Sequence, residues 1–167
     1  MKLTVAASAL ALVTLCSEAS AQSKSLKDRL LGTWHFVIAE VTAPDGQKSF
    51  PFGPKPRGIL IFAPEGDFAQ IHIAGEVPKI ASGNRLAATP EEYAGIMRGT
   101  IAQFGTYTVD EDKKTFTMRF TASTFPNWDG ILQTRTIDKL TDDEMINTNP
   151  QVGAGRGSAY NLYKRAR

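Results

Sequence analysis

Histidine is the side chain best suited to metal binding and proton transfer near neutral pH, and the chain contains two, His35 and His72. They stand far apart, and no cysteine follows Cys16, so a zinc or copper site would lack its usual ligands. We therefore predict no metal and no cofactor. His72 lies in an alternating segment beside Phe68 and Gln70. It is the one weak candidate for a catalytic base, and a hydrogen-bonded structural histidine is the favoured alternative.

Arg135 is the second residue with binding chemistry, because its neighbours in the segment 131–137 are uncharged. Its guanidinium could bind an anion, or it could lie over an indole ring such as that of Trp34 and close one end of the fold. The segment Phe125-Pro126-Asn127-Trp128 places two aromatic rings in a rigid loop. Such rings either cap the core or border a pocket, and we favour the pocket.

Other motifs indicate no chemistry. The sequence has no nucleophile elbow and no Walker loop. Gly153-Ala154-Gly155-Arg156-Gly157 opens no predicted helix, so it is interpreted as a hairpin loop rather than a dinucleotide site. Acidic clusters fall in predicted turns or at a helix start, where water and the helix dipole account for them: Glu91-Glu92, Asp110-Glu111-Asp112 and Asp142-Asp143.

The N-terminal segment has the pattern of an export signal. Lys2 precedes an apolar run from Leu3 to Leu15, and Ala19-Ser20-Ala21 matches a cleavage site, so residues 1–21 are predicted to be a secretory signal peptide. Lipidation at Cys16 is the disfavoured alternative, because a bulky leucine precedes it. We expect an exported protein, periplasmic or secreted, that has no disulfide after cleavage.

The rest of the chain predicts an all-β fold. Short alternating segments separated by Gly, Pro and Asp indicate eight antiparallel strands, at 33–41, 59–62, 67–73, 106–109, 115–124, 131–140, 144–149 and 158–165. In the first of them, Trp34, Phe36 and Ile38 are expected on one face. Thr89-Pro90-Glu91-Glu92 predicts a capped helix that continues to about residue 104. The expected fold is an eight-stranded barrel, eight to nine strands in all, with one inserted helix and a domain spanning 26–167.

Charge and hydropathy limit the classes of binding partner that we expect. The chain carries 19 Lys+Arg and 17 Asp+Glu, a formal net charge of +2 without a basic patch, so nucleic acid is not expected. The apolar run near the N-terminus is too short to span a bilayer, and no later segment is longer.

Several short motifs, in order over residues 26–166, resemble the bacterial lipocalin-like domain family, a distant relative of lipocalin and calycin barrels. They are Leu31-Gly32-Thr33-Trp34, Pro51-Phe52-Gly53-Pro54 with Arg57-Gly58, Thr89-Pro90-Glu91-Glu92, Phe104-Gly105-Thr106-Tyr107, Phe125-Pro126-Asn127-Trp128-Asp129-Gly130 and Arg135. The resemblance implies an antiparallel barrel around a central cavity that binds small apolar molecules. The mid-chain helix departs from many lipocalins, whose helix follows the barrel.

We therefore expect an exported protein that binds a small apolar or amphipathic molecule inside the barrel. The expected lining or rim residues are Phe62, His72, Tyr107, Met118, Phe120, Trp128 and Arg135, and Gly32 and Trp34 are expected to be structural. One alternative is an isomerase or cyclase that uses the same cavity, with His72 or Arg135 handling a proton or an anion. Another is an envelope interaction module that uses loop 51–58 or the basic tail 164–167. An eight-stranded barrel can also be filled by its own side chains, which would leave no binding site.

Overall fold

A computed structural model describes residues 24–152 and 157–167. The predicted signal peptide, Cys16 and most of the predicted glycine-rich loop lie outside these residues. The elements, in chain order, are α1 (Leu26–Leu30), β1 (Gly32–Thr42), β2 (Lys48–Ser49), β3 (Arg57–Phe62), β4 (Asp67–Ile73), α2 (Pro90–Gly99), β5 (Thr100–Asp110), β6 (Thr115–Ser123), the 3-10 turn η1 (Pro126–Trp128), β7 (Leu132–Leu140), β8 (Glu144–Asn149) and β9 (Ser158–Arg165).

The long strands form a closed antiparallel barrel. Each of them from β3 to β9 pairs with the next along the chain, and β1 closes the sheet by pairing with both β3 and β9. The short strand β2 is added to the end of β1. Closure leaves no long unpaired edge, which explains how a run of short strands forms one stable unit. The predicted barrel of eight to nine strands is confirmed.

Side chains alternate between the barrel interior and the outside. Along β6, Phe116, Met118 and Phe120 are buried, as the alternation in the sequence predicts. In β1 the prediction is wrong after Phe36, because a register shift between Phe36 and Ile38 inserts one residue. Ala39 is consequently buried in place of Ile38.

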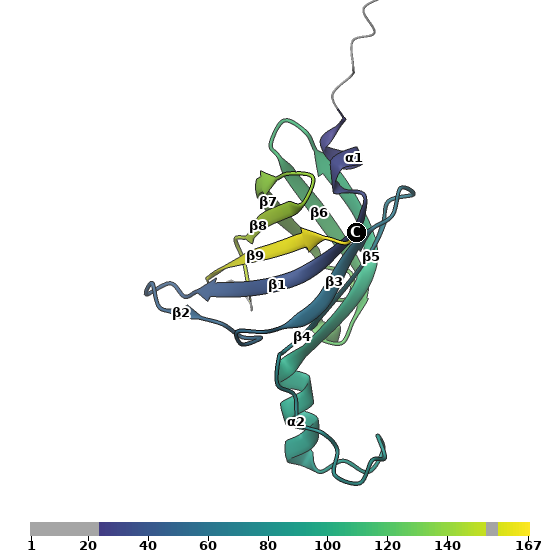
Figure 1. Cartoon of the computed structure of the whole chain (residues 1–167), viewed down its shortest axis with the longest axis vertical. Helices are drawn as coiled ribbons and strands as arrows, with labels where there is room; N and C mark the ends of the chain where they lie inside the picture. Colours follow the sequence, from purple (N-terminus) through teal and green to yellow (C-terminus); the bar gives the residue numbers. More distant parts are fainter. Residues whose placement is uncertain (1–23, 153–156) are drawn as a thin grey trace, which may run out of the picture.

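Helix α2 is shorter than predicted. Its N-terminus has the expected capping box, in which Glu92 N–H donates to Thr89 Oγ1 and Thr89 N–H donates to the Glu92 carboxylate. The helix ends at Gly99, however, and Ile101 and Phe104 belong to β5, which pairs with β4 from Thr100 onward. Seven ladder pairs with β4 outweigh the helical spacing of these apolar residues. Helix α2 extends away from one end of the barrel (Figure 1).

The opposite end of the barrel is closed by the short helix α1 (Figure 1). Leu30 of this helix is fully buried, and its carbonyl accepts a hydrogen bond of 2.7 Å from the Trp34 indole N–H. The cation over the Trp34 ring is Arg165 of β9, at 4.0 Å from the ring centroid. The prediction that Arg135 could occupy this place is therefore wrong. Arg135 stands further along the barrel interior.

Across residues 24–152 and 157–167, no helix has the length and apolar character needed to traverse a bilayer.

Candidate functional site

The barrel interior is divided into an apolar half and a polar half. Along β7 the inward residues run from Ile137 through Arg135 to Gln133, and along β8 they run from Met145 through Asn147 to Asn149. On each strand the apolar residue lies toward α1. Tight aromatic packing fills that half, where the Phe62 ring contacts both Tyr107 and Phe116 edge to face. Any ligand space must therefore lie in the other half.

Eight buried polar or charged side chains from five strands make up the polar half. They are Gln70 and His72 of β4, Gln103 of β5, Gln133 and Arg135 of β7, Asn147 and Asn149 of β8, and Asn161 of β9. Several form hydrogen bonds with one another: Gln103 donates to Gln70 at 3.1 Å, and Asn161 donates to Asn147 at 3.4 Å. Burying this many polar groups is costly unless they are paired with each other or with a bound molecule.

His72 is held firmly inside this network. Its ring stacks on Phe36 with centroids 3.7 Å apart, and its Nε2 lies 2.9 Å from the Tyr163 hydroxyl. The Gln70 amide nitrogen lies 3.1 Å from the same ring atom. Burial, and secondly the nearby positive charge of Arg135, hold the pKa of His72 well below its usual value. His72 is thus a neutral hydrogen-bonding group at neutral pH.

Arg135 is the charged centre of the polar half. It is 5% exposed, and its Nε and Nη1 atoms have no hydrogen-bond partner among the described residues. Burial lowers the pKa of Arg135, while the neighbouring Tyr163 acts in the opposite direction. Burial likewise raises the pKa of Tyr163 to about 12, so the phenol stays protonated and carries no compensating charge. An arginine remains protonated at neutral pH even under such conditions.

A small cavity lies among these groups. This inner cavity has a volume of about 170 Å³, and its polar lining includes Gln70, His72, Gln103, Gln133, Arg135, Asn149 and Asn161. Phe52, Ile101 and Trp128 add apolar surface. No acidic side chain belongs to the lining that the structure describes. Most of the surface that faces the inner cavity is apolar, and Arg135 is the one charged side chain among the described lining residues.

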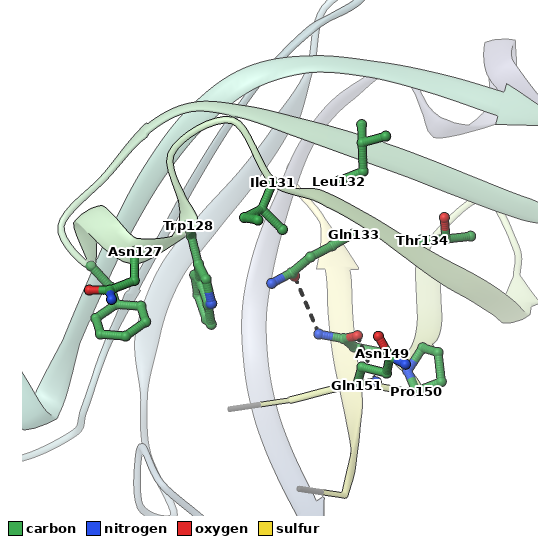
Figure 2. Close-up of a pocket in the computed structure, with 10 residues that line it drawn as sticks. Asn127, Trp128, Ile131, Leu132, Gln133, Thr134, Asn149, Pro150 and Gln151 are labelled. Atoms are coloured by element: carbon green, nitrogen blue, oxygen red, sulfur yellow. Dashed lines mark hydrogen bonds between the residues drawn. The ribbon is translucent and has the colours of Figure 1, made fainter. Parts of the chain in front are cut away.

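The barrel wall opens beside this cavity. The β7–β8 ladder ends at the pair Thr136↔Thr148, so the stretch from Leu132 to Arg135 does not pair with β8. A side groove of about 900 Å³ lies at this gap, lined by Phe125, Asn127, Trp128, Ile131, Leu132, Gln133, Thr134, Asn149, Pro150 and Gln151. Asn149 donates a 3.3 Å hydrogen bond to Gln133 across the gap (Figure 2).

The side groove and the inner cavity share three lining residues, Trp128, Gln133 and Asn149. Trp128 is placed by η1, and its ring stacks on Phe120 with centroids 5.9 Å apart. Figure 2 shows Gln133 and Asn149 pointing toward each other while Leu132 lies on the other side of its strand. Trp128 and the hydrogen-bonded pair Gln133 and Asn149 thus belong to the lining of both spaces.

The residues predicted to line a ligand site fall into two groups. His72, Trp128 and Arg135 line the inner cavity. Phe62, Tyr107, Met118 and Phe120 are buried in the aromatic and aliphatic core instead. Gly32 adopts a φ of +104° at the start of β1, and Trp34, two residues further along, is fully buried.

The sequence analysis overlooked the buried amides. Gln103, Gln133, Asn147, Asn149 and Asn161 were not singled out, although each shares the inward parity of its strand. The sequence does contain a pattern that indicates them. In Met145-x-Asn147-x-Asn149, the two asparagines occupy the same alternate positions of the strand as the buried Met145, so they also point inward. The same pattern occurs in Phe68-x-Gln70-x-His72. Polar residues at alternate positions are usually assigned to solvent, which hides such a pattern.

The profile of the lipocalin-like domain family matches residues 31–161. This range includes β1 to β8 in full and the first half of β9, and it begins just after α1. The chain belongs to the lipocalin-like domain family. No curated protein matches its sequence.

Solved structures similar to this lipocalin-like barrel are remote in sequence. One is a de novo designed fluorescence-activating β-barrel, with 13% identity and a TM-score of 0.45, covering 86% of this chain and 99% of that one. Another is bovine odorant-binding protein in complex with a selenium-containing odorant, with 16% identity and a TM-score of 0.42, covering 86% of this chain and 74% of that one.

The side chains at this lipocalin-like site are suited to hydrogen bonding and to pairing with an opposite charge. The inner cavity is lined by a positively charged guanidinium, amide donors and acceptors and a neutral imidazole, and the Tyr163 phenol lies behind it, beside that imidazole. In the described part of the chain, no three His, Cys, Asp or Glu side chains cluster as metal ligands would. These groups can orient a small polar head, and the adjoining aromatic residues can cover an apolar body.

Proposed function

We propose that this lipocalin-like protein binds a small amphipathic molecule, whose polar end enters the inner cavity and whose apolar body lies in the side groove. The observation that supports this most directly is the sharing of Trp128, Gln133 and Asn149 by the two spaces. Alone, the chamber of about 170 Å³ is smaller than ligand pockets usually are, roughly 300 to 1,000 Å³. With the groove of about 900 Å³ it becomes large enough.

The side groove has the composition expected for an apolar body. Phe125 and Ile131 are partly exposed there, and Trp128 forms the boundary with the chamber. Aromatic and aliphatic groups exposed in a concave surface favour binding of an apolar molecule, because binding removes them from water. We further propose that the protein acts after export, since residues 1–21 have the pattern of a signal peptide.

The test uses N-phenyl-1-naphthylamine, an uncharged apolar probe that fluoresces strongly when it leaves water. We expect saturable binding of one probe per chain. The protein has two tryptophans, Trp34 in the closed end and Trp128 at the groove, so energy transfer to the probe should come mainly from Trp128. Native mass spectrometry of the purified protein would show whether a molecule is already bound.

Two variants make the test specific. Trp128→Ala should weaken probe binding several-fold, because it removes the ring shared by both spaces. Leu86→Ala is the matched control, since Leu86 is 81% exposed and lies outside both spaces. Absence of saturable binding, or equal binding by both variants and the original protein, would contradict the proposal.

A further inference from the structure

Arg135 carries a positive charge that no described side chain neutralises. The ion pairs in the described residues are Lys48–Glu40, Lys113–Asp110, Lys139–Glu144 and Arg167–Asp143, and all involve exposed or partly exposed lysine or arginine side chains. Arg135 takes part in none of them. A buried cation without a counter-charge is strongly unfavourable, because it has lost its hydration.

The buried polar atoms that lack a hydrogen-bond partner indicate which chemical group could bind there. Nε and Nη1 of Arg135 both lack an acceptor, and these two belong to the same guanidinium group. A guanidinium donates in several directions within its plane, and an anion such as a carboxylate is its strongest acceptor. Two further buried atoms of the polar half lack a partner among the described residues: the donor Asn147 Nδ2, which lies outside the cavity lining, and the acceptor Gln103 Oε1. The inner cavity thus has free donors and an uncompensated positive charge at Arg135, and one free acceptor at Gln103.

The neighbouring groups limit the charge of the partner. His72 faces Arg135 as a neutral imidazole, and the Tyr163 phenol is protonated. The other polar lining groups, Gln70, Gln103, Gln133, Asn149 and Asn161, are uncharged amides. One fixed positive charge balances one negative charge, whereas a phosphate dianion would remain partly uncompensated.

We propose that the polar end of the ligand is a carboxylate, which enters the inner cavity from the side groove and pairs with the Arg135 guanidinium. This inference rests on the proposed binding function and specifies the chemical class of the ligand as a small amphipathic carboxylic acid. The volume of about 170 Å³ accommodates a carboxylate with a few carbons, and the remainder of the molecule extends along the groove.

The test compares three probes that share one chain and differ in head group: octanoate, 1-octanol and octylamine. Their affinities for the full chain are measured by isothermal titration calorimetry at pH 7.5. We expect octanoate to bind at least about 10-fold more tightly than 1-octanol, and octylamine to bind most weakly. Sodium phosphate and sodium chloride are titrated separately as sources of a simple inorganic anion.

Variants assign the effect to one residue. Arg135→Gln should abolish the preference for octanoate over 1-octanol. Arg135→Lys should retain part of the preference, because the charge remains but the planar donors do not. Arg119→Gln is the matched control, since Arg119 is exposed on the neighbouring strand β6, and it should bind octanoate as the original protein does.

A direct spectroscopic readout does not depend on how the variants fold. Octanoate should shift the Arg135 Nε–H resonance of the unaltered protein, because that atom gains an acceptor, whereas 1-octanol should leave it in place. Octanoate and 1-octanol binding equally tightly would overturn the carboxylate assignment while leaving the proposed binding function intact. Binding of phosphate or chloride alone would also overturn it, and failure of every probe, including N-phenyl-1-naphthylamine, would contradict the binding function itself.

Discussion

The Arg165 guanidinium lies over the Trp34 indole ring, 4.0 Å from its centroid, and joins the last strand of the barrel to the first. Its N–H groups also donate to three backbone carbonyls, those of Leu31 at 2.8 Å, Arg29 at 2.6 Å and Asp142 at 2.5 Å. One side chain therefore satisfies the end of α1, covers the buried tryptophan and anchors the β7–β8 turn. The closed end of the barrel depends on this contact.

Replacing Arg165 by alanine should lower the free energy of unfolding by about 2 to 4 kcal/mol. The estimate combines charged hydrogen bonds to carbonyls with a partly buried cation–π contact. Urea denaturation monitored by circular dichroism would measure the change. Arg167→Ala is the control: the Arg167 ion pair with Asp143 is largely exposed, and its loss should have no measurable effect. Equal stability of the two variants would argue against a structural role for Arg165.

Stability should fall on mild acidification because of His72. The pKa of this residue is held well below its ordinary value of 6.5 in the folded barrel, chiefly by burial. Below about pH 6.5 the unfolded chain therefore binds a proton that the folded chain does not, and the proton favours unfolding. Urea midpoints at pH 7.5 and pH 5.5 should differ more for the original protein than for His72→Gln.

His35→Gln provides the control for this comparison, because His35 is exposed on β1. It should show the same drop between pH 7.5 and pH 5.5 as the original protein. A drop in His72→Gln as large as that of the original protein would mean that other groups cause the acid sensitivity.

Gly105 occupies a place where the strands β5 and β6 approach too closely for any side chain. A Cβ atom there would lie 1.9 Å from the Arg119 carbonyl oxygen, next to the register shift between Phe104 and Gly105. Gly105→Ala should destabilise the fold by about 3 kcal/mol, the upper end of overpacking costs. Gly46→Ala is the comparison, since its φ of +83° is strained for alanine but its surroundings are open, and it should cost about 1 kcal/mol. Thermal unfolding would rank the two, and the reverse order would contradict the close approach.

Glu92 should titrate with a midpoint below its ordinary value of 4.5. Backbone N–H groups of Ala81 and Thr89 donate to its carboxylate at 2.9 and 2.8 Å and lower its pKa. The carboxylate therefore stabilises the start of α2 above pH 4.5, and this support is lost as the pH falls through the lowered pKa. The amide resonances of Ala81 and Thr89 should follow that titration in NMR spectra and should not do so in Glu92→Gln. A midpoint at or above 4.5 would show that these hydrogen bonds do not persist in solution.

The sequence by itself determined the barrel and much of its detail. Alternation, turn residues and the Thr89–Glu92 capping box are local patterns with a direct physical meaning, and each reappears in the structure. Local patterns predicted the structure least well where pairing with a strand distant in the sequence competes with them. Ile101 and Phe104 have helical spacing but join β5, and Ile38 loses its inward position to a bulge, because ladder partners decide both.

Only the tertiary structure decided which side chains from different strands become neighbours. The sequence marked Arg135 as a cation among uncharged neighbours and Trp34 as a structural tryptophan, but it could not show that Arg165 covers Trp34 while Arg135 stands unpaired beside the inner cavity. The buried amides acquire meaning in the same way, since five strands must close around one axis before they meet. Strand periodicity fixes which way a side chain points, whereas closure of the barrel fixes which charges are left without partners.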